Sequence, residues 1–342
     1  VKVGPQILGR ILDGMGNPID GSGPLNTKIK QPVYNKPPDP LNRQSVDKIM
    51  ETGIRSIDGF TTIGKGQRMG IFAGSGVGKS VLLSILAKQS KADVNVIALI
   101  GERGREVKEF IDKNLGEEGL KKSVIIVSTS DQAPMLRLKA ALTATAISEY
   151  FRDQGKDVMF MMDSLTRVAM AQREIGLAVG EPPTTKGYTP SVFSLLPKII
   201  ERAGNGTVGS ITGLYTILIE GDDLDDPIGD TSRSLLDGHI VLSRKLASMG
   251  HYPPVDVLNS ISRLANDIIS DGHKDQKKKI LSLLSAYKEN EDLISVGAYE
   301  EGSNTLIDEA IKAKESISDF LIQDMNDSTD FHYMQNEMNK LV

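Results

Sequence analysis

The chain has 342 residues, 39% of them apolar, which is enough for a large domain and a smaller appendage around a buried core. It carries 40 Lys and Arg residues against 45 Asp and Glu residues, and the net charge of −5 favours neither nucleic acid nor anionic lipid as a partner. Because the chain has no cysteine, disulfides, thiolate metal sites and a cysteine nucleophile are excluded.

The distribution of apolar residues indicates in which cellular compartment to expect the protein. No apolar run approaches the roughly 20 residues that a membrane-spanning helix needs, and no signal-peptide pattern opens the chain. We therefore expect a cytoplasmic protein whose membrane contacts are peripheral. Residues 1–4 resemble sequence from the middle of a domain, so we expect a further segment to precede them.

Residues 1–45 form the first segment and are rich in glycine, proline and asparagine, as in 14–18 and 37–40. This composition is typical of turns and loops. We predict a connecting segment here that is not part of a hydrophobic core.

From about residue 66, short apolar runs of strand length alternate with helical patterns. The predicted strands are 69–73, 94–100, 124–127, 158–162, 214–219 and 239–242, and the stretches 80–88 and 135–151 are compatible with helices. Buried strands that alternate with helices require right-handed crossovers. The pattern predicts an α/β domain with a mostly parallel sheet that is covered on both faces.

Beyond about residue 264 the strand pattern ends, and apolar residues recur at spacings of three and four. These residues are Ile280, Leu283, Leu284 and Tyr287, then Leu306, Ala310, Ala313, Ile317 and Phe320. This period is typical of amphipathic helices, so we predict a small helical C-terminal domain. We place the segment boundaries at 1–45, 46–264 and 265–342.

A glycine-rich loop follows the first strand of the α/β domain. It runs Ala73-Gly74-Ser75-Gly76-Val77-Gly78-Lys79-Ser80, and an apolar helical stretch begins directly after it. The glycines allow backbone angles that turn successive N–H groups inward, and the helix adds the partial positive charge of its N-terminus. We predict that residues 74–80 bind the phosphates of a nucleotide. The alternative is a glycine-rich turn with an incidental lysine.

Two side chains of this loop have predicted roles. Lys79 would neutralise charge on the β- and γ-phosphates of ATP, and the Ser80 hydroxyl would ligate Mg²⁺. The first position of the usual G-x-x-x-x-G-K-[ST] pattern is occupied by Ala73, which departs from that pattern.

Two carboxylates follow other predicted strands. Asp163 comes after the run 158–162, where an acid beside a phosphate loop holds the hydration shell of Mg²⁺. Glu102 follows the run 94–100, at the sheet edge where α/β proteins bind ligands, and we predict that it orients or deprotonates the attacking water. The alternatives are a turn or cap for Asp163 and a surface salt-bridge cluster for Glu102.

With these elements in order, the chain resembles the flagellar and type III secretion export ATPases, relatives of the catalytic β subunit of rotary ATP synthases. The likeness covers essentially the whole chain and rests on residues 8–13, 70–80, 101–107, 162–167, 220–223, 236–244 and 250–258. An alanine at position 73 resembles the sequences of the export branch of this family. The resemblance implies a RecA-like P-loop core, preceded by a six-stranded β-barrel of which residues 1–45 would be the remnant and linker.

The resemblance also implies roles for single residues. Glu102 matches the family's catalytic glutamate and Arg103 its phosphate-side neighbour, while Arg167 looks like the arginine that approaches the γ-phosphate within the same subunit. Tyr252 looks like the aromatic side chain that stacks on adenine, and Arg263 resembles the arginine finger that enters a neighbouring subunit's site. The alternatives are core packing for the tyrosine and ordinary salt bridges for Arg167 and Arg263.

The function implied by the resemblance is Mg²⁺-dependent ATP hydrolysis that drives protein export, by a homohexameric ring at the inner-membrane export apparatus. The implied partners are a stator-like regulator subunit, export-gate membrane proteins and chaperone–substrate complexes, without nucleic acid. Residues 180–188 are expected to be either a loop near the subunit interface or channel, or an inert connection. The sequence does not separate flagellar from virulence-type export.

Three other functions use a similar core. One is a catalytic-type subunit of an F- or V-type rotary ATPase, and another is a ring-shaped nucleic-acid motor of the termination-helicase type. The aromatic content of 5% offers the latter no evident stacking platform. The third is a binding module that holds nucleotide only as a structural ligand.

Overall fold

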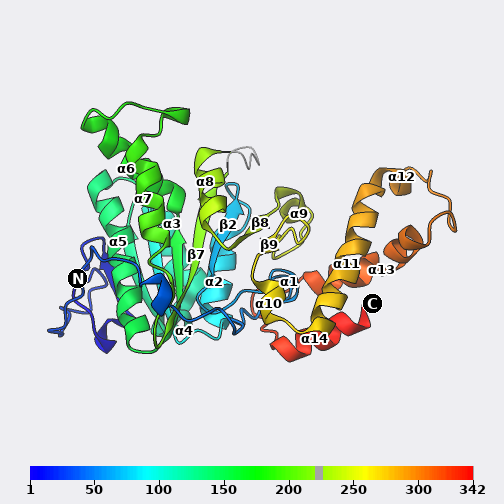
Figure 1. Ribbon diagram of the computed structural model, residues 1–342, viewed down its shortest axis with the longest axis horizontal. Coiled ribbons are helices and arrows are strands. Elements are labelled where there is room, and N and C mark those ends of the chain that lie inside the picture. The colour runs from blue at the N-terminus through cyan, green and yellow to red at the C-terminus, as the bar shows by residue number, and fades with distance from the viewer. Residues whose placement is uncertain (220–225, 342) are drawn as a thin grey trace.

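The computed structural model describes residues 1–219 and 226–341 (Figure 1). The motif Glu220-Gly221-Asp222-Asp223, on which the family resemblance partly rests, lies outside the described residues. The molecule is elongated, with the sheet domain and N-terminus at one end and the C-terminal helices at the other (Figure 1).

The described strands form one nine-stranded sheet in the order β1-β4-β3-β5-β7-β2-β8-β9, with β6 beside β7. All neighbouring strands pair in parallel except β6 with β7 and β8 with β9. The strands are β1 Ile11–Asp13, β2 Arg68–Ala73, β3 Val94–Ile100, β4 Ser123–Ser128, β5 Asp157–Asp163, β6 Gly204–Asn205, β7 Ser210–Leu218, β8 Gly238–Leu242 and β9 Ile261–Ser262. The predicted α/β class and the mostly parallel sheet are confirmed.

Alternate residues of each strand face opposite sides of the sheet, where two hydrophobic cores form. In β2, Ile71 packs in the core that contains the apolar residues of α2, whereas Phe72 packs in the core beneath α5, α6 and α7. The helices before residue 250 are α1 Arg55–Phe60, α2 Lys79–Gln89, α3 Gly104–Glu109, α4 Gly116–Lys121, α5 Pro134–Asp153, α6 Leu165–Ala178, α7 Pro190–Ile200, α8 Pro227–Leu235 and α9 Arg244–Ser248.

Short irregular helices complete this part of the chain. A π-helical turn over Phe110–Leu115 joins α3 to α4, and 3₁₀ turns cover Pro5–Ile7, Pro40–Asn42 and Thr185–Gly187. The last of these lies in the loop that projects from the sheet domain between α6 and α7 (Figure 1). Its expected place near a subunit interface or channel stays a prediction.

The prediction that residues 1–45 lie outside the core is wrong. Strand β1 pairs in parallel with β4, with Ile11 opposite Ile125. Val3, Ile7 and Leu12 are fully buried in the core beneath α5. The strand has only three residues and is flanked by turn-forming glycine and proline, so the local composition concealed it. The three segment boundaries themselves stay a prediction.

The C-terminal region is helical as predicted, with α10 Ala265–Ile268, α11 Asp271–Glu289, α12 Glu291–Ser295, α13 Thr305–Leu321 and α14 Phe331–Lys340. The side chains of Ser270, Asn304 and Asp330 cap α11, α13 and α14 by accepting backbone N–H bonds. The predicted apolar faces are largely buried, but Leu306 in the first turn of α13 is 42% exposed.

The C-terminal helices pack on the same core as the phosphate-loop helix. Ile280, Ile317 and Phe320 belong to the hydrophobic cluster that also contains Leu82 and Ile97. This shared core joins the C-terminal helices to the α2 face of the sheet. Within residues 1–219 and 226–341, none of the helices combines the length and apolar character needed to cross a membrane.

Candidate active site

The glycine-rich loop lies between β2 and α2, at the carboxyl edge of the parallel strands. Gly76 and Gly78 adopt φ angles of 75° and 96°, in the left-handed region that favours glycine. A Cβ on Gly76 would meet no atom within 4 Å, so its backbone conformation, and not crowding, requires glycine there. Helix α2 begins at Lys79, and its first N–H groups have no partners within the helix. The loop therefore has the geometry of a phosphate-binding site.

Lys79 lies between the two predicted carboxylates. Its Nζ is 2.5 Å from Asp163 Oδ1 and 3.3 Å from Glu102 Oε1. The three side chains are only 12%, 3% and 15% exposed, respectively. The structure thus brings together the lysine, the predicted metal ligand and the predicted base, which the sequence places on three separate segments.

The strand order explains this cluster. Asp163 is the last residue of β5, Glu102 follows β3, and the phosphate loop follows β2, so all three lie at the same sheet edge. Strand β7 runs between β5 and β2, and its Thr216 donates its hydroxyl to Asp163 Oδ1 at 2.7 Å. The oxygen of Asp163 that contacts Lys79 is thereby fixed by a second strand.

The charges of the cluster perturb one another. Burial by itself would lower the pKa of Lys79, but the carboxylates of Asp163 and Glu102 raise it above its ordinary value. Burial raises the pKa of Glu102, the Lys79 ammonium lowers it, Asp163 raises it further, and the net direction is upward. A carboxyl group with a raised pKa is a better proton acceptor than an exposed one, which suits a general base.

Arg167 lies in the first turn of α6, which is capped by Ser164. Its side chain covers Gly101, because a Cβ on that glycine would lie 2.9 Å from Arg167 Cβ. Its Nε is buried and has no hydrogen-bond partner among the described residues. A buried guanidinium nitrogen without a partner, on a side chain that packs against the residue before Glu102, fits a group that binds an anionic ligand.

Tyr252 also lies beside the phosphate loop. A Cβ on Gly78 would lie 3.5 Å from Tyr252 Cε1 and 3.8 Å from Pro254 Cγ. The tyrosine is 44% exposed, so it is not a core residue. An aromatic ring that is half open to solvent beside a phosphate loop is suited to stacking on a base.

The oxygen donors at this edge of the sheet suit Mg²⁺ only as part of a larger ligand set. Among the described residues, no group of three or more His, Asp or Glu side chains could hold a metal ion by itself. Mg²⁺ usually combines one or two protein ligands with substrate phosphates and water. Ser80, in the first turn of α2, and the Asp163 carboxylate at the end of β5 would supply that kind of partial shell.

Two predicted arginines do not join this cluster. Arg103 is 78% exposed at the side chain and pairs with Glu106 at 3.3 Å. Arg263 is exposed next to β9, and its Nη2 donates to the Arg233 carbonyl oxygen at 3.1 Å. Their predicted roles remain predictions.

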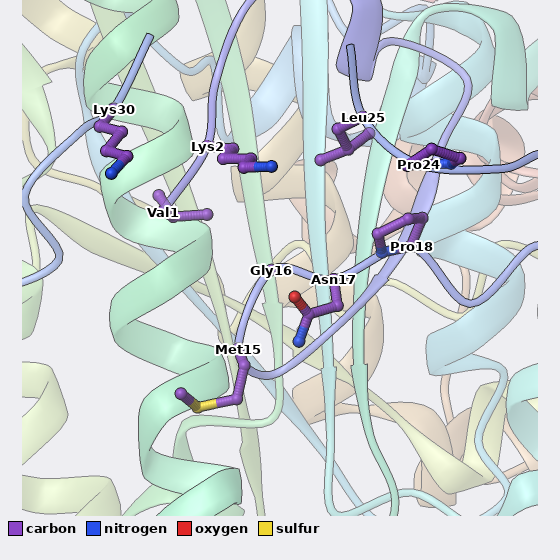
Figure 2. A pocket seen from close by; sticks show the side chains of 9 residues that line it. All are labelled: Val1, Lys2, Met15, Gly16, Asn17, Pro18, Pro24, Leu25 and Lys30. Atoms are coloured by element: carbon purple, nitrogen blue, oxygen red, sulfur yellow. The ribbon is translucent and has the colours of Figure 1, made fainter. Parts of the chain in front are cut away.

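A hollow of about 370 Å³ lies elsewhere, near β1 (Figure 2). Four strands separate β1 from β2 in the sheet, so this hollow is not part of the nucleotide site. Its lining comes from the first 30 residues: Val1, Lys2, Met15, Gly16, Asn17, Pro18, Pro24, Leu25 and Lys30.

Comparison with known proteins agrees with the geometry. Residues 53–262 match the ATP synthase alpha/beta family, nucleotide-binding domain, and residues 269–340 match the T3SS EscN ATPase C-terminal domain. The chain is 58% identical to the flagellum-specific ATP synthase of Bacillus subtilis over 94% of this chain and 74% of that protein. It is 52% identical to the type 3 secretion system ATPase of Xanthomonas euvesicatoria over 94% of this chain and 73% of that protein.

The chain belongs to the flagellar and type III secretion ATPase family. The structure of a prototypical ATPase from the type III secretion system of pathogenic bacteria superposes with a TM-score of 0.94, at 47% identity, over 100% of this chain and 99% of that one. The structure of the assembled ATPase EscN from enteropathogenic E. coli also gives a TM-score of 0.94, at 46% identity, over 99% of this chain and 82% of that one.

Membership of this ATPase family makes the chain an ATP-hydrolysing enzyme and confirms the resemblance inferred from the motifs. The relatives support an export ATPase and give no support to the rotary-ATPase or termination-helicase alternatives. Thr216, which bonds to Asp163, is a candidate site residue that the motifs do not single out. Its only sequence signal is a polar residue in the apolar strand 214–219.

Proposed function

We propose that this ATPase hydrolyses Mg·ATP to drive protein export in a flagellar or type III secretion apparatus, as a subunit of a homohexameric ring. The contact of Lys79 with both Asp163 and Glu102 beside the phosphate loop carries the enzymatic part of the proposal. The names of the relatives carry the export part.

In the proposed site, the triphosphate lies on the backbone amides of Gly74, Ser75, Gly76, Val77, Gly78, Lys79 and Ser80. The Lys79 ammonium exchanges its carboxylate partners for oxygens of the β- and γ-phosphates. Ser80 and Asp163 hold Mg²⁺, which when bound neutralises phosphate charge. Tyr252 stacks on the adenine ring.

Hydrolysis then needs one activated water. Glu102 orients the water and accepts its proton as the water oxygen bonds to the γ-phosphorus. The bond between that phosphorus and the β–γ bridging oxygen breaks, and ADP and inorganic phosphate leave. Arg167 stabilises the negative charge on the γ-phosphoryl group within the subunit. Arg103, which pairs with Glu106 in this structure, would have to turn from that partner to reach the phosphates beside Glu102.

Arg263 has a different proposed position, in the site of the neighbouring subunit. Its exposure next to the edge strand β9 leaves it accessible to a second copy of the chain. A finger that acts between subunits ties hydrolysis to assembly. An isolated monomer is then nearly inactive.

The proposed partners follow from relatives. A solved structure of EscN in complex with its central stalk EscO, 46% identical to this chain, supports a regulator or stalk subunit. We place the ring at the cytoplasmic side of the inner-membrane export apparatus, in contact with export-gate proteins and chaperone–substrate complexes. Nucleic acid is not among the proposed partners.

The proposal is tested by phosphate release at increasing protein concentration, with and without EDTA. Activity per subunit should rise with concentration and disappear on Mg²⁺ removal. Activity per subunit that does not depend on concentration would contradict the shared site, and stimulation by single-stranded RNA would favour a nucleic-acid motor.

A further inference from the structure

A short segment after α13 connects the C-terminal helices to the nucleotide site. The backbone N–H of Gln323 donates to the Tyr252 carbonyl oxygen at 2.8 Å. The ring of Tyr252 lies beside Gly78 of the phosphate loop. A residue of the C-terminal region is therefore bonded directly to the residue to which we assign adenine binding.

The side chain of Gln323 is buried, with 5% exposed, and uses both donors of its amide. Its Oε1 accepts the Arg55 backbone N–H at 2.9 Å, and its Nε2 donates to the carbonyl oxygens of Gly53 and Asp327, each at 2.7 Å. These bonds hold the residue against the start of α1. Because the backbone of residue 323 moves with its side chain, they also fix the donor to Tyr252.

Other bonds hold the same junction. Arg55 donates from Nε to the Phe320 carbonyl oxygen at 2.7 Å and from Nη2 to the Ile322 carbonyl oxygen at 2.5 Å. Gln89, the last residue of α2, donates from Nε2 to the Met325 carbonyl oxygen at 3.1 Å. The phosphate-loop helix and Tyr252 are thus both hydrogen-bonded to one segment, residues 320–327.

We propose that Gln323 is a positioning residue that holds Tyr252 for the adenine ring and so couples the C-terminal helices to nucleotide occupancy. The inference rests on the proposed function, in which Tyr252 stacks on adenine. Gln323 acts through Tyr252 and does not touch the nucleotide. Ligands with an adenine ring should therefore depend on Gln323, and ligands that contain only phosphates should not.

The test compares Mg·ADP with Mg·pyrophosphate by calorimetry, using the whole chain. Gln323→Ala should raise the Kd of Mg·ADP about tenfold, which corresponds to about 1.4 kcal/mol, because it removes the side-chain hydrogen bonds that hold the backbone donor to Tyr252 in place. The Kd of Mg·pyrophosphate should change less than twofold. In ATPase assays the KM for ATP should rise while kcat stays within about twofold.

Two further variants make the result specific. Gln276→Ala removes a hydrogen bond between α11 and Asn339 of α14 and serves as the matched control, with both Kd values unchanged. Tyr252→Ala should raise the Kd of Mg·ADP, and adding Gln323→Ala to it should raise that Kd no further.

Equal weakening of Mg·ADP and Mg·pyrophosphate, no weakening of either, or additive effects of the two substitutions would overturn the inference. If Tyr252→Ala alone leaves Mg·ADP binding unchanged, the adenine assignment is wrong and the inference fails with it. If the unmodified protein does not hydrolyse ATP, the proposed function itself is contradicted.

Discussion

Two ion clusters in this chain are built from similar charges but differ in how many of their polar groups have hydrogen-bond partners. Glu149 on α5 and Arg202 are 0% and 2% exposed and meet in two hydrogen bonds of 2.7 Å. Arg202 Nη1 also donates to the Val33 carbonyl oxygen at 2.9 Å. In the Lys79 cluster, by contrast, one ammonium is shared between two carboxylates and the nearby Arg167 Nε has no partner in the described part of the chain.

The difference separates structural ion pairs from a ligand site. The hydrogen bonds of the buried Glu149–Arg202 pair are complete, so this sealed cluster has no interaction left for a ligand. Removing one partner leaves the other charge buried without a counter-charge. The Lys79 cluster, by contrast, has partly satisfied groups, glycines with left-handed backbone angles and a helix N-terminus, and this open cluster can still bind a phosphate. Substitutions in the first should therefore unfold the protein, and substitutions in the second should stop its chemistry.

The largest expected effect comes from outside the subunit. Arg263→Ala should lower kcat about 10³- to 10⁵-fold while ATP binding persists, because the open cluster would lose a charge supplied by the neighbouring subunit. Steady-state ATPase assays and ATP calorimetry measure the two quantities. Arg105→Ala, which removes a side chain that is 80% exposed, is the control.

Mixing sharpens this prediction. Arg263→Ala subunits combined with Lys79→Ala subunits should recover activity, because some interfaces would then contain both intact residues. If the mixture stays as inactive as its components, the finger does not act between subunits.

Glu102→Gln should lower kcat about 10²- to 10⁴-fold, the usual contribution of a positioned base. Thermal unfolding should stay close to that of the unmodified protein, because the amide keeps the shape of the open cluster. Glu109→Gln on the exposed face of α3 is the control. Unchanged hydrolysis by Glu102→Gln would remove Glu102 from the mechanism.

The pH profile gives a second view of Glu102. Its pKa is raised, so the acid limb of kcat/KM should lie above the ordinary range of a glutamate, with activity lost as the pH falls and the base becomes protonated. The limb should be absent in Glu102→Gln. A limb at the usual glutamate value would show that another group titrates.

Glu149→Gln tests the sealed cluster. It should lower the free energy of unfolding by about 3–5 kcal/mol, because the Arg202 charge would remain buried without its partner. The kcat of the protein that stays folded should be unchanged. Denaturant unfolding followed by circular dichroism measures the loss, and a large fall in kcat at full folding would erase the contrast between the clusters.

Thr216→Val should have the smallest effect. It removes the hydroxyl that fixes Asp163, which corresponds to about 1 kcal/mol and to a fall in kcat/KM of up to about tenfold. Raising Mg²⁺ should offset part of the loss, because Asp163 is the proposed metal ligand. Thr212→Val on the same strand is the control, and an equal loss there would contradict a specific role for Thr216.

The sequence predicts the site better than its surroundings, for physical reasons. The phosphate loop and the strands that end at Asp163 and before Glu102 have local signals, because glycine turns and apolar runs depend on neighbours in the chain. Strand β1 was missed because its pairing with β4 spans more than 100 residues and its own three residues carry no pattern. Gln323 and Thr216 could not be found in the motifs, because their partners lie on other elements.

The proposed mechanism requires that the triphosphate bind on the backbone amides of the phosphate loop. A crystal structure of the assembled protein with Mg·ADP and aluminium fluoride tests it directly. We expect phosphate oxygens on the amides of residues 74–80, Lys79 Nζ moved from the carboxylates to the phosphates, and Glu102 in contact with the attacking water. Nucleotide bound elsewhere, or Glu102 turned away from the aluminium fluoride, would contradict the account.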